Sequence, residues 1–197
     1  KLEVYFLFES LDVYGKEIEV KFLSFLRGEE KFDNFSNLKS AIEHDVINAK
    51  KYFREKSNIH LALIGKNISH SKSQLMYEDL LKQAVNYDLL DYESPDNLPS
   101  LFELKKRYLG VSITAPYKKH YLEMGTVINS KIPAINCIVF KEGSTELHNT
   151  DYLAALEILN GFQIDTETTV SVLGDGAMGQ LMEKVCEELK LPFKTYS

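Results

Sequence analysis

From residue 60 onward, short apolar runs alternate with longer segments of helical period, and this alternation limits the fold most. The expected strands are His60–Ile64, Tyr87–Asp91, Gly110–Ile113, Asn136–Phe140 and Glu146–His148. The expected helices are Ser71–Val85, Pro95–Tyr108, Tyr117–Met124 and Asp151–Ile158. Strand–helix–strand units wind right-handed and set their strands parallel. The sequence therefore predicts an α/β fold with a mainly parallel βαβ domain.

A second unit of the same kind follows the polar stretch GFQIDTET. We expect a strand at Thr169–Leu173, a helix at Gln180–Leu189 and a strand at Pro192–Tyr196. The intervening turn carries a GxGxxG pattern, formed by Gly174, Gly176 and Gly179. In a strand-turn-helix context this pattern indicates a dinucleotide site at the start of a Rossmann domain. A glycine-rich turn without a ligand stays open as the alternative, and the acidic Asp175 within the turn favours it slightly.

The first 53 residues have a different pattern. Two alternating runs, LEVYFLF and EIEVKFLSFL, flank a turn at Asp12–Gly15 and predict a β-hairpin. A helix is expected from Ser36, as N-cap, to about Phe53. A hairpin and one helix bury too little apolar surface to fold alone. With residues 54–58 as a polar linker, we expect three parts, 1–57, 58–165 and 166–197.

Charge and composition exclude several classes of protein. The formal net charge of −6 over 197 residues does not favour a nucleic-acid partner. No apolar run approaches the ~20 residues that span a bilayer, so we expect no membrane association. Cys137 and Cys186 lack a CxxC or metal-ligand spacing, which indicates a reduced, cytoplasmic protein without a metal site.

Polar side chains gather where the predicted strands end. Ser69, Ser71 and Ser73 lie at a helix start, where hydroxyls and free N–H groups suit a carboxylate, although such serines are also common helix caps. Lys118 lies in the first turn of the next predicted helix, where the helix dipole disfavours a cation. A positive charge in a place that the helix dipole disfavours suggests a functional role for Lys118. The alternative is that Lys118 is an ordinary solvated lysine.

The third polar turn, at Asn149–Asp151, links a strand to a helix. Asn and Asp there are commonly caps. The functional alternative pairs Asp151 with Lys118, because reduction of a ketone needs a proton donor and an ammonium held by a carboxylate can supply the proton.

Residues 2–53 resemble the C-terminal part of riboflavin kinase, the barrel module of bacterial FAD synthetases. The matching features are the D-x-YGK turn at Asp12–Lys16, the LRGEEKF stretch and the D-V-x-x-A-K helix end. The resemblance makes Glu3 a possible flavokinase base, although Tyr5 replaces the usual histidine.

Residues 59–197 resemble shikimate dehydrogenase. Residues 65–74 resemble the family's G-x-P-I-x-H-S-x-S-P motif, and residues 112–118 resemble its N-V-T-x-P-x-K motif. Residues 134–137 resemble its A-x-N-T segment, and residues 149–151 match its N-T-D segment. Prolines are replaced by Asn67 and Gln74, an asparagine by Ser112 and a threonine by Cys137. None of these departures removes a charged group.

The resemblance implies a role for each matched residue. Lys118 and Asp151 would be catalytic, Ser71 and Ser73 would bind the substrate carboxylate, and Thr114 and Asn136 would hold ring hydroxyls. The NADP(H) turn would consist of Gly174, Gly176, Ala177 and Gly179. We expect the cofactor domain to be C-terminally truncated.

The expected function is NADPH-dependent reduction of 3-dehydroshikimate to shikimate, in a fusion with a riboflavin kinase module. Three alternatives stay open. They are a quinate/shikimate dehydrogenase, a riboflavin kinase that forms FMN as its main activity, and a non-catalytic chain that binds shikimate.

Overall fold

The structure is a computed structural model that describes residues 4–162, 164 and 167–196. The chain forms two compact units, one of residues 1–60 with 71–87 and one of residues 61–70 with 88–197. No helix among the described residues is long and apolar enough to cross a membrane.

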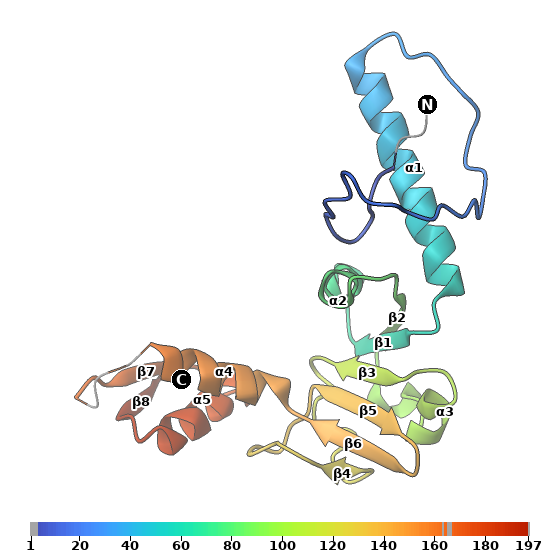
Figure 1. The fold of residues 1–197 in the computed structure, drawn as a ribbon. Coiled ribbons are helices and arrows are strands. Elements are labelled where there is room, and N and C mark those ends of the chain that lie inside the picture. Colours follow the sequence, from blue (N-terminus) through green and yellow to red (C-terminus); the bar gives the residue numbers. More distant parts are fainter. Residues whose placement is uncertain (1–3, 163, 165–166, 197) are drawn as a thin grey trace. The chain divides into compact units, whose positions relative to one another are not determined.

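Helix α1, Phe35–Lys56, dominates the first unit (Figure 1). Asn34 caps it by accepting a hydrogen bond from the Asn37 N–H at 2.9 Å, so the cap lies two residues before the predicted Ser36. Arg54 and Lys56 lie in its last turn, where the helix dipole favours cations. The predicted linker at 54–58 is therefore wrong in its first half, because residues 54–56 continue the helix.

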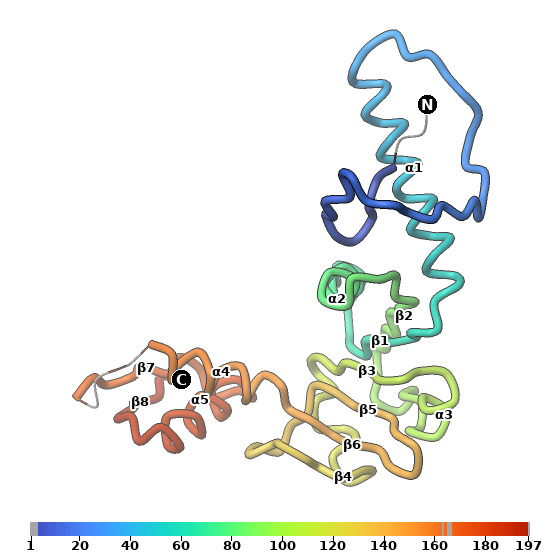
Figure 2. Tube along the Cα trace, in the orientation of Figure 1, coloured from blue at the N-terminus to red at the C-terminus, as the bar shows by residue number. Residues whose placement is uncertain are grey.

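The predicted N-terminal hairpin is also wrong. Residues 4–34 form no strand, and Figure 2 shows them as an irregular trace. The predicted turn does form, since the Tyr14 N–H donates to Asp12 Oδ1 at 3.1 Å and Gly15 has φ +71°. An isolated two-stranded ladder is marginal without a covered apolar face. Here Phe22 and Phe25 are 88% and 84% exposed, so no such face stabilises the pairing.

The main sheet has the strand order β2-β1-β3-β5-β6-β4 (Figure 1). Its strands are β1 His60–Gly65, β2 Asn86–Asp91, β3 Gly110–Ile113, β4 Thr126–Val127, β5 Cys137–Lys141 and β6 Ser144–His148. β1 pairs with β3 and β4 with β6 in parallel, whereas β5 is antiparallel to both β3 and β6. β7 Val170–Leu173 and β8 Phe193–Tyr196 form a separate parallel pair. The predicted α/β architecture with a mostly parallel sheet is confirmed.

Three predicted helices are shorter than expected or absent. In place of the predicted helix at Ser71–Val85, the structure has the shorter α2, Ser73–Leu81. In place of the predicted helix at Pro95–Tyr108, it has η1, Pro95–Asn97, and α3, Leu101–Lys105. The predicted helix Tyr117–Met124 is wrong, because this segment forms consecutive turns with i to i+3 hydrogen bonds. Buried Tyr117 and Tyr121 donate from their hydroxyls to backbone carbonyls of residues 92 and 99. These tertiary anchors override the local helical pattern.

Two apolar clusters stabilise the second unit. The larger joins the sheet to α3, and its fully buried members include Ala62, Ile64, Ile135, Ile138 and Leu147. The smaller joins helix α4, Thr150–Gly161, to helix α5, Ala177–Glu188, through Tyr152, Leu181 and Val185. Ile132 and Ala134 from the loop before β5 belong to this second cluster. That loop and the start of α4 are therefore packed together.

Candidate functional site

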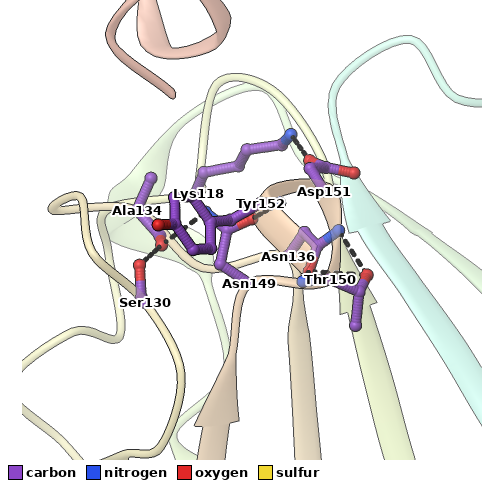
Figure 3. Close-up of polar contacts among 8 residues, drawn as sticks. All are labelled: Lys118, Ser130, Ala134, Asn136, Asn149, Thr150, Asp151 and Tyr152. Carbon is purple, nitrogen blue, oxygen red and sulfur yellow. Dashed lines mark hydrogen bonds and ion pairs between the residues drawn. The ribbon is translucent and has the colours of Figure 1, made fainter. Parts of the chain in front are cut away.

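Lys118 and Asp151 form an ion pair, which is the centre of the candidate site (Figure 3). Lys118 Nζ lies 2.6 Å from Asp151 Oδ2, and the two side chains are 21% and 32% exposed. Asp151 lies in the first turn of α4, where the positive end of the helix dipole stabilises a carboxylate. Lys118 lies in the turns after β3 and not in a helix. The pairing predicted from the sequence is present, and its charges are screened only partly by solvent.

Backbone contacts fix the position of Lys118. Its carbonyl accepts a hydrogen bond from the Ile135 N–H at 2.8 Å. The preceding residue, Tyr117, is buried, and its N–H donates to the carbonyl of Thr114 at 3.0 Å. The backbone of Lys118 is thus anchored to the loop before β5, and its side chain reaches Asp151.

Asn136 and Thr150 form a second polar pair beside the first (Figure 3). Asn136 Nδ2 donates to Thr150 Oγ1 at 2.8 Å, and Asn136 Oδ1 accepts from the Thr150 N–H at 2.8 Å. The Thr150 hydroxyl also lies 3.1 Å from that oxygen. This pair joins the start of β5 to the start of α4. Thr150 was not predicted as a site residue, although its place between Asn149 and Asp151 was a signal.

The neighbouring thiol remains neutral. Burial raises the pKa of Cys137, which follows Asn136 directly. Its replacement of a threonine therefore adds no charge near the Lys118–Asp151 pair. Among the residues that the structure describes, no cluster of His, Cys, Asp and Glu is arranged to hold a metal ion.

Thr114 lies at the end of β3, close to the end of β1. Its N–H donates to the Ile64 carbonyl at 2.9 Å. A Cβ on Gly65 would lie 2.4 Å from Thr114 Cγ2 and 2.5 Å from Ile68 Cγ2, so any other residue here would displace these two methyl groups. Gly65 therefore permits the close approach of the two strand ends. The role of Thr114 in holding a ligand stays a prediction.

Ser71 and Ser73 belong to the first unit, unlike the site residues described above. The Ser71 hydroxyl donates to Ser73 Oγ at 3.0 Å and accepts from the Ser73 N–H at 3.2 Å. No side chain caps α2 at its N-cap residue, Lys72. The two hydroxyls are thus grouped at a helix start, and their role in binding a carboxylate stays a prediction. Glu3, the possible flavokinase base, lies outside the described residues.

The glycine turn between β7 and α5 has the geometry that a pyrophosphate site requires. Gly174 has φ +94°, which favours glycine. A Cβ on Gly179 would lie 2.0 Å from the Gly174 carbonyl oxygen, so α5 packs directly on the turn. Gly176 is the N-cap of α5 and offers no side chain to cover the first N–H groups, which begin at Ala177. These residues fit a dinucleotide cofactor.

Comparison with known proteins gives two similarities. Residues 1–53 match the family model "Flavokinase: Riboflavin kinase". The chain is 35% identical over 123 residues to shikimate dehydrogenase (NADP(+)) of Clostridium beijerinckii. The aligned region covers 58% of this chain and 45% of that relative. The chain thus spans about half the length of the curated relatives it matches.

Solved structures agree with this similarity. Shikimate 5-dehydrogenase from Thermus thermophilus in complex with shikimate superposes with a TM-score of 0.59 at 25% identity, over 70% of this chain and 55% of that chain. A chorismate mutase/shikimate 5-dehydrogenase fusion protein from Clostridium acetobutylicum also has a TM-score of 0.59, at 21% identity, over 71% of this chain and 55% of that chain, and shows a common fold. The predicted resemblance to shikimate dehydrogenases and to riboflavin kinase is confirmed.

Proposed function

We propose that this chain contains the substrate-binding part of a shikimate dehydrogenase, which reduces 3-dehydroshikimate to shikimate with NADPH. The observation that supports this most is the half-buried Lys118–Asp151 pair at 2.6 Å beside the Asn136–Thr150 pair. An ammonium, a carboxylate and an amide grouped at strand ends suit a ligand rich in hydroxyls. The similarity to shikimate dehydrogenases supports shikimate and 3-dehydroshikimate as the ligands in this proposal.

In this proposal Lys118 donates a proton to the carbonyl oxygen of the substrate. An O–H bond forms at that oxygen as the carbonyl carbon accepts hydride and the C=O double bond becomes a C–O single bond. No free alkoxide therefore accumulates. Asp151 orients the ammonium, because its carboxylate already holds Nζ on one side. Asn136 and Thr114 would hold ring hydroxyls, and Ser71 and Ser73 the substrate carboxylate. Lys118 recovers its proton from solvent, to which its side chain is 21% exposed.

The residues of the glycine turn would hold the cofactor. Gly174, Gly176 and Gly179 allow the backbone to approach a pyrophosphate, and the Ala177 end of α5 offers uncapped N–H groups. NADP(H), when bound, supplies the hydride that reduces the carbonyl carbon. The name of the Clostridium beijerinckii relative supports NADP(H) over NAD.

A Lys118→Ala variant tests the proposal, with Lys119→Ala as the matched control at an exposed neighbouring lysine. NADPH consumption is followed by absorbance with 3-dehydroshikimate, and shikimate binding by calorimetry. Loss of a positioned proton donor typically lowers turnover by about 10²–10⁴-fold, with a smaller effect on binding. Unchanged turnover in Lys118→Ala would contradict the role of this residue.

The same two measurements separate the alternatives. Shikimate binding without NADPH oxidation would indicate a non-catalytic binding protein. Competition between shikimate and quinate would show whether the chain is a quinate/shikimate dehydrogenase, since that choice depends on a few contacts around Ser71, Ser73 and Thr114. The match of residues 1–53 to riboflavin kinase favours a fusion. FMN formation from riboflavin and ATP would show that this module is the main activity.

The remaining expectations concern location and partners. Cys137 and Cys186 are free thiols, which agrees with a reduced, cytoplasmic location, and this location stays a prediction. The proposed partner is the small-molecule substrate alone.

A further inference from the structure

Asn149 is a buried polar residue that none of the roles above uses. Its side chain is buried, with 1% of the residue exposed. Among the residues that the structure describes, Glu78 is the other buried polar or charged residue. Burying an amide is costly unless its donors and acceptors are satisfied. The side chain of Asn149 lies between Ala134 and the start of α4 and is hydrogen-bonded to both (Figure 3).

Three hydrogen bonds define the place of Asn149. Its side-chain oxygen accepts from the Tyr152 N–H at 3.0 Å and so caps α4. Its amide nitrogen donates to the Ala134 carbonyl at 3.0 Å. Its own N–H donates to Asn129 Oδ1 at 3.0 Å. One side chain therefore connects the N-terminus of α4 to the loop that precedes β5.

One connected segment contains Asp151, and the other is hydrogen-bonded to the backbone of Lys118. The loop side contains Ile135, whose N–H holds the Lys118 carbonyl at 2.8 Å. The helix side contains Asp151, two residues after Asn149. Ser130 supports the loop, because its hydroxyl also lies 2.7 Å from the Ala134 carbonyl oxygen. One path of hydrogen bonds between Lys118 and Asp151 thus runs through Ile135, Ala134 and Asn149.

We propose that Asn149 is a positioning residue, which holds the two segments together so that Lys118 Nζ meets Asp151. This proposal rests on the proposed function for the meaning of the pair, but its geometry does not require a substrate. Helix capping alone is the competing explanation. A cap requires only the side-chain oxygen, whereas the bond to Ala134 requires the amide nitrogen.

An Asn149→Ser variant separates the two explanations. Serine is a good N-cap and keeps an oxygen near the Tyr152 N–H, but it has no amide to reach Ala134. It also adds no charge near Lys118. The matched control is Asn34→Ser, because Asn34 caps α1 through the equivalent contact with the Asn37 N–H.

The readout is the rate at which acetic anhydride labels each lysine of the full chain, measured by mass spectrometry. Lys118 is compared with its exposed neighbour Lys119 in the same molecule. In Asn149→Ser we expect the Lys118/Lys119 ratio to rise about fivefold, the change that loss of one net hydrogen bond produces. Asn34→Ser should leave the ratio unchanged, even where it lowers the melting temperature.

A lower melting temperature with an unchanged ratio in Asn149→Ser would overturn the proposal and leave only capping. Should this variant fail to fold, Asn149→Thr decides, because threonine also keeps a capping oxygen and also lacks the amide that reaches Ala134. An unchanged ratio there also overturns the proposal. Shikimate protection of Lys118 in the unmodified chain tests the proposed function separately. Absence of protection would contradict that function and leave the positioning role intact.

Discussion

Glu78 is buried against Arg54 within the first unit. The guanidinium donates from Nε to Oε1 at 2.7 Å and from Nη2 to Oε2 at 2.8 Å, and the side chains of Glu78 and Arg54 are 3% and 27% exposed. Glu78 Oε1 also lies 3.4 Å from the Val85 N–H. Arg54 lies in the last turn of α1, directly after the segment that matches riboflavin kinase, and Glu78 lies on α2 in the segment that resembles shikimate dehydrogenase. A buried charge pair thus connects α1, most of which lies in the segment that matches riboflavin kinase, to α2 in the segment that resembles shikimate dehydrogenase.

Removing one partner of this pair should destabilise the chain strongly. An Arg54→Met change leaves the Glu78 carboxylate buried without its cation, which costs about 3 kcal/mol in free energy of unfolding. Urea unfolding followed by circular dichroism measures this loss. The double variant Arg54→Met, Glu78→Leu should regain part of the stability, because no charge then remains buried.

The control is Asp79→Asn on the same helix. Asp79 pairs with Lys82 at 2.9 Å, but its side chain is 78% exposed. Exposed pairs contribute little, so the unfolding midpoint should not move measurably. An equal loss in Asp79→Asn and Arg54→Met would show that burial is not the cause.

The same pair should make stability depend on pH. Burial acts to raise the pKa of Glu78, but the hydrogen bonds and charge of Arg54 and the Val85 N–H outweigh it, so the pKa lies below its ordinary value. A lowered pKa in the folded state contributes stability above the unfolded value of about 4.3, and this is lost as pH falls further. Unfolding free energies measured from about pH 6 down to about pH 3 should therefore fall less steeply in Glu78→Gln. Identical slopes would contradict the assignment.

Alternation of strands and helices predicted most of the second unit, because its strands are bounded by turn residues and its apolar period is clear. β4 was missed, since Thr126 and Val127 are too short a run to show a period. The helix expected at 117–124 failed because Tyr117 and Tyr121 bind distant carbonyls, and no local pattern reveals such partners. The predicted hairpin does not form, because the apolar face of its alternating residues packs against nothing within the described chain.

In the candidate site, too, some features follow from the local sequence and others depend on tertiary contacts. The pairing of Lys118 with Asp151 was predictable from the polar turns that follow strands, and Asn136 from the resemblance to shikimate dehydrogenase. Asn149 was recognisable as a cap, but its bond to Ala134 depends on a contact 15 residues away in sequence. Ser130 had no sequence signal at all, and its two carbonyl partners at positions 132 and 134 become visible only in the folded loop.

The glycine turn offers a further prediction. A Gly179→Ala change places a Cβ 2.0 Å from the Gly174 carbonyl oxygen, so α5 must move away from the turn. Forced overpacking of this kind costs about 2 kcal/mol. Hydrogen exchange should show faster exchange in β7 and α5, together with a lower melting temperature. Gly161→Ala is the matched control, because a Cβ there meets no atom within 4 Å, and it should leave α5 unchanged.

Thr150 should determine the orientation of the Asn136 amide. Its hydroxyl accepts from the Asn136 amide nitrogen at 2.8 Å, and valine has the same shape without that acceptor. The amide would then be held only through its oxygen, which accepts from the Thr150 N–H, and a site that needs the amide for a ring hydroxyl would lose affinity. We expect shikimate to bind about fivefold more weakly to Thr150→Val, the equivalent of one net hydrogen bond. Thr150→Ser keeps the hydroxyl and should bind nearly as the unmodified chain does. Calorimetric titration of the three proteins measures the difference, and equal affinities for Thr150→Val and the unmodified chain would place Asn136 outside the binding site.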